Sequence, residues 1–165
     1  MSGYNPEELR ATLRSAIQEG EAHIKQLERA SLVLAPVFPL TADSLRSLAD
    51  DQVPVLDQFI YRFTKLQDSM ASRLLPTLHS LLRADDSPRP FLDILSYLEQ
   101  LGALSSEDRW LFFRALRNNL AHDYPESTEQ TAQTLNTLYQ NWSELRDMFT
   151  TARDYFLSYE SDSQP

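Results

Sequence analysis

The stretch PVLDQFIYRFTKLQDSMASRLLPTLHSLLR, residues 54–83, decides the fold class. Its apolar residues recur every three or four positions, which is the spacing of one face of an α-helix and not the alternation of a β-strand. The expected buried face consists of Leu56, Phe59, Ile60, Phe63, Leu66, Met70, Leu74 and Leu78. We therefore predict one long helix, with a kink at Pro76, because a proline inside a helix removes a backbone hydrogen bond.

The rest of the chain repeats this pattern and contains only three glycines. A first helix should begin at Pro6, with Asn5 as its N-cap and Glu8 in its first turn, and end before residue 36. Further helices are expected over 41–49, over 91–101 with Gly102 closing it, from Ser106 to about residue 124, and from Ser127 to about residue 157. The sequence thus predicts an all-α, up-and-down bundle of about five helices, one domain over residues 1–165 with a frayed tail from about residue 158.

The composition restricts the cellular compartment in which the protein can be expected and the kinds of binding site that it can form. The chain has no cysteine, so it forms neither a disulfide nor a thiolate metal site. It has no basic start followed by an apolar run, and no apolar stretch approaching the roughly 18 residues of a spanning helix. We therefore expect a cytoplasmic protein that does not contact the membrane.

The formal net charge of −9 argues against broad nonspecific binding of nucleic acid. A small catalytic groove needs only local positive charge, however, and 13 of the 15 basic residues are arginines. Three of them, Arg109, Arg114 and Arg117, lie in the helix that begins at Ser106. The acidity would suit a regulated partner of complementary charge, or it would only keep the protein soluble.

The residues Arg117-Asn118-Asn119-Leu120-Ala121-His122-Asp123-Tyr124 gather a guanidinium, an amide, an imidazole and a phenol within eight positions. Arginine offers a rigid fork of donors to phosphate oxygens, and histidine both gives and takes a proton near neutral pH. This octet favours phosphate chemistry. Taken without other information, such a group near a helix end is more often a capping cluster than a catalytic site.

The arrangement Arg-x4-His-x-Tyr, with Asn directly after the Arg, resembles the signature of the HEPN superfamily and in particular its HepT-like toxins. A second stretch, residues 57–68 (DQFIYRFTKLQD), is similar to the Arg-Phe-containing helix of HepT-like proteins and of nucleotidyltransferase substrate-binding subunits. Together the two stretches cover about an eighth of the chain, and the rest agrees only in being helical.

The resemblance implies a homodimeric ribonuclease toxin that needs no metal or other cofactor and is neutralised by a cognate minimal nucleotidyltransferase. It makes Arg117, Asn118 and His122 the catalytic residues. His122 would transfer a proton, Arg117 would stabilise the charge at phosphorus, and Asn118 would orient the reacting groups. Arg114 and Tyr124 would bind RNA, and the antitoxin would attach AMP to Tyr124.

One geometric difficulty arises from the spacing of the octet. Arg117 and His122 are five residues apart, which places them about 140° apart around an undistorted helix. Either the helix unwinds ahead of Pro125, or two chains pack so that His122 of one meets Arg117 of the other. Both arrangements stay open.

Two other classes of function compete with the ribonuclease. In one, the chain is a non-catalytic substrate-binding or regulatory subunit of a minimal nucleotidyltransferase, and the octet is a recognition patch. In the other, the chain is a helical scaffold whose octet tolerates substitution. We expect His23 and His79 to be surface or boundary residues, and neither has the neighbours that a metal site requires.

Overall fold

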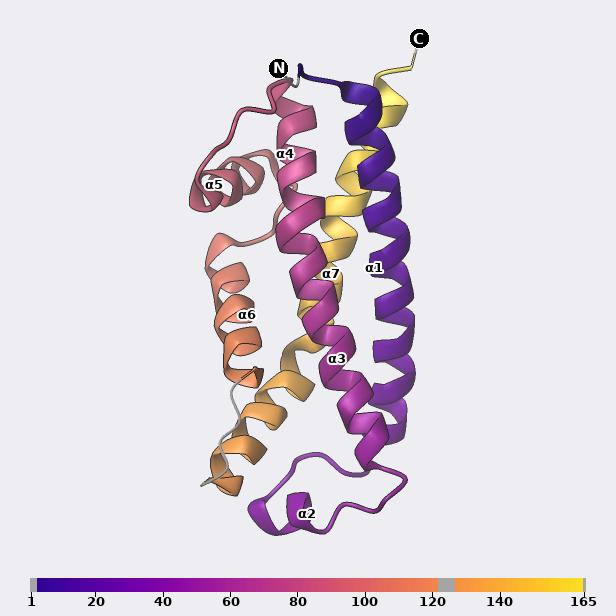
Figure 1. Cartoon of the computed structure of the whole chain (residues 1–165), viewed down its shortest axis with the longest axis vertical. Helices are drawn as coiled ribbons and strands as arrows, with labels where there is room; N and C mark the ends of the chain where they lie inside the picture. The colour runs from indigo at the N-terminus through magenta and orange to yellow at the C-terminus, as the bar shows by residue number, and fades with distance from the viewer. Residues whose placement is uncertain (1–2, 122–126, 165) are drawn as a thin grey trace.

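The structure is a computed structural model that describes residues 3–121 and 127–164 (Figure 1). Its elements are α1 (Pro6–Leu34), α2 (Ala42–Arg46), α3 (Val53–Ser69), the π-helical turn η1 (Met70–Leu74), α4 (Leu75–Arg83), α5 (Phe91–Leu101), α6 (Glu107–Leu120) and α7 (Thr128–Asp162). The helices α1, α3–α4 and α7 run along the long axis, and α6 lies beside them, while α2 lies in the connection between α1 and α3 (Figure 1). The predicted all-α bundle is confirmed. None of the described helices is both long and apolar enough to cross a membrane.

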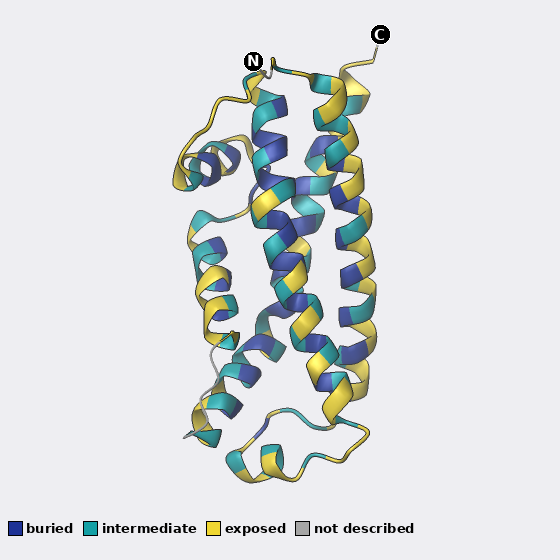
Figure 2. Ribbon diagram, viewed as in Figure 1, coloured by how far each residue is buried: buried dark blue, intermediate teal, exposed yellow. Residues whose placement is uncertain are grey.

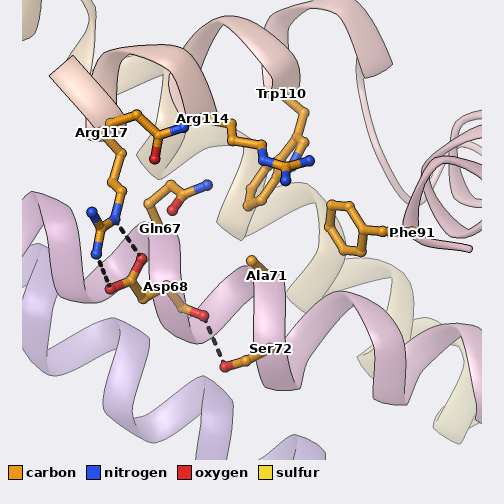
Figure 3. A pocket seen from close by; sticks show the side chains of 9 residues that line it. Gln67, Asp68, Ala71, Ser72, Phe91, Trp110, Arg114 and Arg117 are labelled. Atoms are coloured by element: carbon orange, nitrogen blue, oxygen red, sulfur yellow. Dashed lines mark hydrogen bonds and ion pairs between the residues drawn. The ribbon is translucent and has the colours of Figure 1, made fainter.

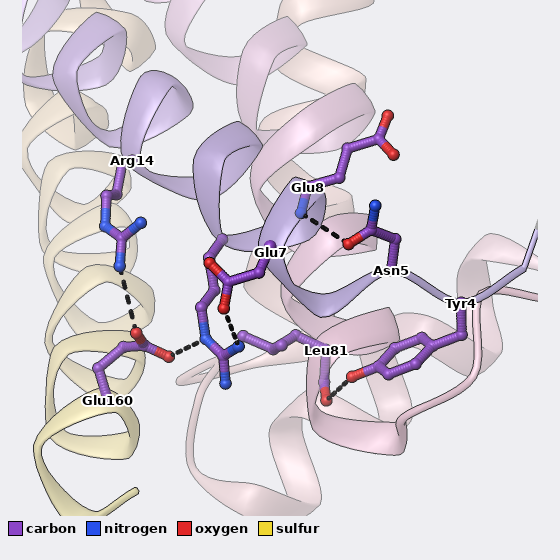
Figure 4. A network of polar contacts seen from close by, with 8 residues as sticks. Tyr4, Asn5, Glu7, Glu8, Arg14, Leu81 and Glu160 are labelled. Carbon is purple, nitrogen blue, oxygen red and sulfur yellow. Dashed lines mark hydrogen bonds and ion pairs between the residues drawn. The ribbon is translucent and has the colours of Figure 1, made fainter. Parts of the chain in front are cut away.

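Most helix ends follow the residues that predicted them. The side chain of Asn5 accepts a hydrogen bond from the backbone N–H of Glu8 at 3.3 Å and caps α1 (Figure 4). Ser106 and Ser127 cap α6 and α7 in the same way, each accepting from the backbone N–H three residues further on, at 3.1 and 3.2 Å. Gly102 has φ +82°, and it ends α5 in the left-handed conformation that glycine adopts at little cost.

The long helix predicted over residues 54–83 is α3, η1 and α4 in direct succession. The irregularity that the structure shows is the π-helical turn η1, which ends two residues before Pro76, whereas the prediction was a kink at Pro76 itself. In this turn the N–H of Leu75 bonds to the carbonyl of Met70, five residues back instead of four. Pro76 has no N–H to offer the carbonyl four residues earlier, and a widened turn accommodates that missing bond.

The core lies between α1, α3–α4, α6 and α7, whose buried residues face inward in Figure 2. The predicted face of the long helix is buried at Leu56, Phe59, Phe63, Leu66, Met70, Leu74 and Leu78, whereas Ile60 is half-buried. At one crossing α1 and α7 approach so closely that a Cβ added to Gly20 would lie 2.1 Å from Cε2 of Phe149. Only glycine fits this crossing without displacing the Phe149 ring.

The expectation of a frayed tail from about residue 158 is wrong over most of its length. Helix α7 continues to Asp162. Its end is held against α1 by Glu160, which accepts hydrogen bonds from Arg10 at 2.7 Å and from Arg14 at 3.3 Å (Figure 4). These cross-helix ion pairs could not be read from the polar composition of the tail.

The expectation that His23 and His79 lie at the surface or boundary is also wrong. His23 is 8% exposed and His79 is 3% exposed. Nδ1 of His23 accepts a hydrogen bond from Nη1 of Arg62 at 3.1 Å, and the ring of His79 meets that of Tyr97 edge-on, with centroids 5.1 Å apart. Each histidine lies four residues from a buried leucine, so each falls on the inward face of its helix.

Candidate functional site

Helix α6 positions the candidate site, and three of its side chains anchor it to the bundle. Trp110, Phe113 and Leu116 are buried, three residues apart from one another. Phe113 packs against Phe63 of α3, with ring centroids 6.2 Å apart. The spacing of three places these side chains on one face of the helix.

Arg117 lies in the last turn of α6 and forms a two-pronged ion pair with Asp68 of α3. Its Nε donates to Oδ1 of Asp68 at 2.9 Å, and its Nη2 donates to Oδ2 at 3.1 Å (Figure 3). This hydrogen bonding raises the pKa of the guanidinium above its ordinary value. Asp68 was not among the predicted site residues, although it closes the stretch 57–68 on which the resemblance rests.

A pocket of about 370 Å³ opens between α3, η1 and α6 beside this ion pair. Its lining consists of Gln67, Asp68, Ala71, Ser72, Phe91, Trp110, Arg114, Arg117 and Asn118. Figure 3 shows Arg114 and Arg117 reaching from α6 on one side and Gln67 and Asp68 from α3 on the other. The structure thus brings together three of the predicted site residues, Arg114, Arg117 and Asn118.

The polar side chains of this pocket differ in their partners. Within the described residues, the side chains of Gln67, Arg114 and Asn118 make no hydrogen bond, whereas Arg117 is bonded to Asp68. Gln67 is nevertheless only 3% exposed. The pocket therefore presents donors and acceptors that the surrounding described side chains do not use.

His122 and Tyr124, the other two predicted site residues, lie outside the described residues, as does Pro125. The predicted placement of His122 relative to Arg117 therefore stays a prediction. Helix α6 ends at Leu120, with Ala121 as its C-cap. In residues 3–121 and 127–164, no group of three or more His, Asp or Glu side chains is placed to hold a metal ion.

Comparison of the chain with protein-family models, curated proteins and solved structures gave no match. The resemblance to the HEPN superfamily rests on the two sequence stretches alone and stays a prediction. The pocket beside the end of α6 is the structural basis for assigning a function, because it combines two arginines with amides that have no partner among the described residues.

Proposed function

We propose that the chain is a metal-independent endoribonuclease toxin whose site includes the pocket beside the end of α6. One observation carries this proposal: Arg114, Arg117 and Asn118, which the sequence singles out for phosphate chemistry, line the same pocket. Residue 122 comes only four positions after Asn118 in the chain. The proposal adds His122 to the same site.

The charge of the pocket answers the main objection, which was the net charge of −9. Among the described lining residues, two guanidinium groups face one carboxylate, so the lining is positive where the protein as a whole is acidic. A positive pocket on an otherwise acidic protein favours the binding of a single phosphate group over extended, nonspecific contact with RNA.

The ion pair with Asp68 is compatible with a catalytic role for Arg117. A guanidinium has five N–H groups, and Arg117 gives one from Nε and one from Nη2 to Asp68. Both N–H groups of Nη1 and the second of Nη2 remain for a phosphate. Asp68 would therefore fix the orientation of Arg117 in advance, which reduces the entropy lost when RNA binds.

The reaction that suits these groups is internal transphosphorylation of RNA. The ribose 2′-oxygen attacks the neighbouring phosphorus, the bond from phosphorus to the 5′-oxygen breaks, and the products carry a 2′,3′-cyclic phosphate and a 5′-hydroxyl. His122 would take the proton of the 2′-hydroxyl or give one to the leaving 5′-oxygen. Arg117 would stabilise the negative charge that develops at phosphorus, and Asn118 would orient the scissile group.

The partners proposed with this activity come from the resemblance. The toxin would be a cytoplasmic homodimer neutralised by a cognate minimal nucleotidyltransferase, which would attach AMP to Tyr124. Added phosphate at Tyr124 would compete with RNA for the arginines of the pocket.

A second candidate function is supported by the same ion pair. Because Asp68 occupies two donors of Arg117, the arginine is less available to a phosphate than a free one. This favours a non-catalytic substrate-binding or regulatory subunit of a nucleotidyltransferase, in which the Arg117–Asp68 pair holds α6 against α3.

The two functions are separated by incubating the purified chain with labelled RNA in EDTA. The ribonuclease predicts fragments with 2′,3′-cyclic phosphate ends for the wild type and a large loss of cleavage in His122→Ala and Asn118→Ala. Asn119→Ala is the matched control, because Asn119 is exposed on α6 and does not line the pocket. Intact RNA with the wild type would overturn the ribonuclease and favour the binding subunit.

A further inference from the structure

The inner part of the pocket holds an amide that lacks a partner. Gln67 is 3% exposed, its side chain makes no hydrogen bond to a described residue, and it points from α3 into the pocket (Figure 3). An amide removed from bulk water without hydrogen bonds costs free energy, so buried amides normally have partners. Gln67 therefore offers one donor group and one acceptor to a molecule that enters the pocket.

The end of the pocket away from Arg117 is aromatic. Phe91 is half-buried and packs against the fully buried Trp110, with ring centroids 6.1 Å apart and an angle of 55° between the ring planes. Phe91 lies at the far end of the pocket from Arg117 (Figure 3). A phenyl ring at the edge of a pocket is suited to contact a flat heterocycle, because every nucleobase has a π-face that stacks on aromatic side chains.

The floor of the pocket comes from the π-helical turn. Ala71 and Ser72 lie in η1, and both carry small side chains on the pocket side. Their size leaves depth between α3 and α6, and π-helical turns occur frequently at functional sites. The resulting volume of about 370 Å³ lies within the range of about 300–1,000 Å³ that small-molecule sites occupy.

We propose that this pocket takes one unpaired adenine nucleotide of the RNA substrate, with the base against Gln67 and Phe91 and its phosphate near Arg114. The inference rests on the proposed ribonuclease function and adds a base preference to it. Adenine is favoured over uracil because its two fused rings offer the larger face for stacking on Phe91. Its amino group and adjacent ring nitrogen also match the acceptor and donor of the Gln67 amide. Arg114 is exposed and has no ion pair with a described residue, so its charge is available to the phosphate.

The inference is tested by isothermal titration of the full chain with AMP, UMP and inorganic phosphate. AMP should bind more tightly than UMP, since the larger face of the purine stacks more strongly on Phe91. Gln67→Met keeps the length of the side chain and removes the amide, and it should weaken AMP binding by about tenfold. Gln18→Met, on the exposed face of α1, should bind AMP as the wild type does.

Two further variants separate loss of the site from loss of the fold. Ala71→Leu fills the floor of the pocket and should abolish AMP binding while the thermal midpoint stays near that of the wild type. Arg114→Ala should weaken AMP and inorganic phosphate to a similar extent, because it removes a charge and leaves base recognition intact. Equal affinity for AMP and UMP, or AMP binding unchanged in Gln67→Met, would overturn the inference.

Failure of this inference is distinguishable from failure of the proposed function. A chain that cleaves RNA but binds AMP and UMP equally lacks the adenine subsite and remains a ribonuclease. A chain that binds AMP through Gln67 but leaves RNA intact keeps the nucleotide site and loses the ribonuclease.

Discussion

Helix α3 and its continuation contact the bundle on two sides that use polar residues differently. On the closed side, toward α1, polar side chains pair between the helices: Arg62 bonds to the buried His23, and Arg73 bonds to Glu19 and Ser15. On the open side, toward α6, Arg117 bonds to Asp68, but a pocket lies beside this pair, and Gln67 in it has no partner among the described residues. Polar side chains on the closed side hold two helices together, whereas the open side also presents polar side chains that no described residue uses.

The sharpest test of this comparison uses two arginines of α6 that are both paired with carboxylates. Arg117 pairs with Asp68 inside the pocket, and Arg109 pairs with Glu144 of α7 outside it. Arg117→Ala should reduce RNA cleavage by about 10²–10³-fold, as the loss of one donor to a transition-state charge does. Arg109→Ala should leave the cleavage rate unchanged. Equal losses of cleavage rate in the two variants, measured as initial rates, would show that the pocket does not take part in catalysis.

Away from the pocket, the crossing of α1 and α7 should be less tolerant of added volume than the open side of α3. Gly20→Ala places a methyl group against the Phe149 ring at the α1–α7 crossing and should lower the free energy of unfolding by about 1–3 kcal/mol, despite the better helix propensity of alanine. Gly3→Ala meets nothing within 4 Å and is the control. Urea denaturation measures both. A neutral Gly20→Ala would mean that the α1–α7 crossing adjusts easily.

The paired histidine makes the closed side sensitive to pH. Burial, followed by the charges of Arg62 and Lys65, lowers the pKa of His23, while Glu19 opposes the shift. The unfolded chain therefore takes up its proton near pH 6.5, above the pKa in the folded protein. The free energy of unfolding should fall as the pH is lowered through about 6.5 and should level off below the folded pKa.

Urea denaturation between pH 7.5 and 5.5 measures this fall. His23→Asn keeps an acceptor for Arg62 and cannot take up the proton, so its free energy of unfolding should fall less than that of the wild type. Burial also lowers the pKa of His79. Part of the fall in the free energy of unfolding should therefore remain in the His23→Asn variant. An identical fall in the two proteins would contradict the assignment to His23.

The smallest effect on stability should come from breaking the ion pair on the open side. The side chain of Asp68 is 40% exposed and that of Arg117 is 28% exposed, so Asp68→Asn should change the free energy of unfolding by less than about 1 kcal/mol. The same variant removes the one carboxylate of the pocket and should bind RNA more tightly in low salt. A loss of several kcal/mol would instead make this pair a structural clamp.

The fold was largely predictable because helical periodicity and capping residues are local signals. Leu56 to Leu78 predicted the buried face, and Asn5 and Gly102 predicted two helix ends. The errors came from partners that are distant in sequence. Glu160 orders the end of α7 through α1, and the hydrogen-bond partner of the buried His23 is Arg62 of α3.

The candidate site was predictable only in part for the same reason. Arg117 and Asn118 stand out within one short motif, whereas Asp68 and Gln67 join them from a helix some 50 residues away. Gln67 did carry a signal: it lies four residues after the buried Phe63 and four before Ala71, at the edge of the apolar face. A polar residue in that position indicates either a buried hydrogen bond or a ligand.

The π-helical turn also keeps two halves of one helix in phase. Leu66, Met70, Leu74 and Leu78 are all buried although they are spaced by four, a repeat that drifts by about 40° at each step around an α-helix. A wider turn absorbs part of that drift. Deleting a single residue of η1 would make the bond from the N–H of Leu75 an ordinary α-helical bond and would leave Leu78 facing the core. A deletion in the regular part of α3 would instead rotate every later side chain of the helix by about 100°. The turn should therefore tolerate the loss of one residue better than the α-helical segments on either side of it.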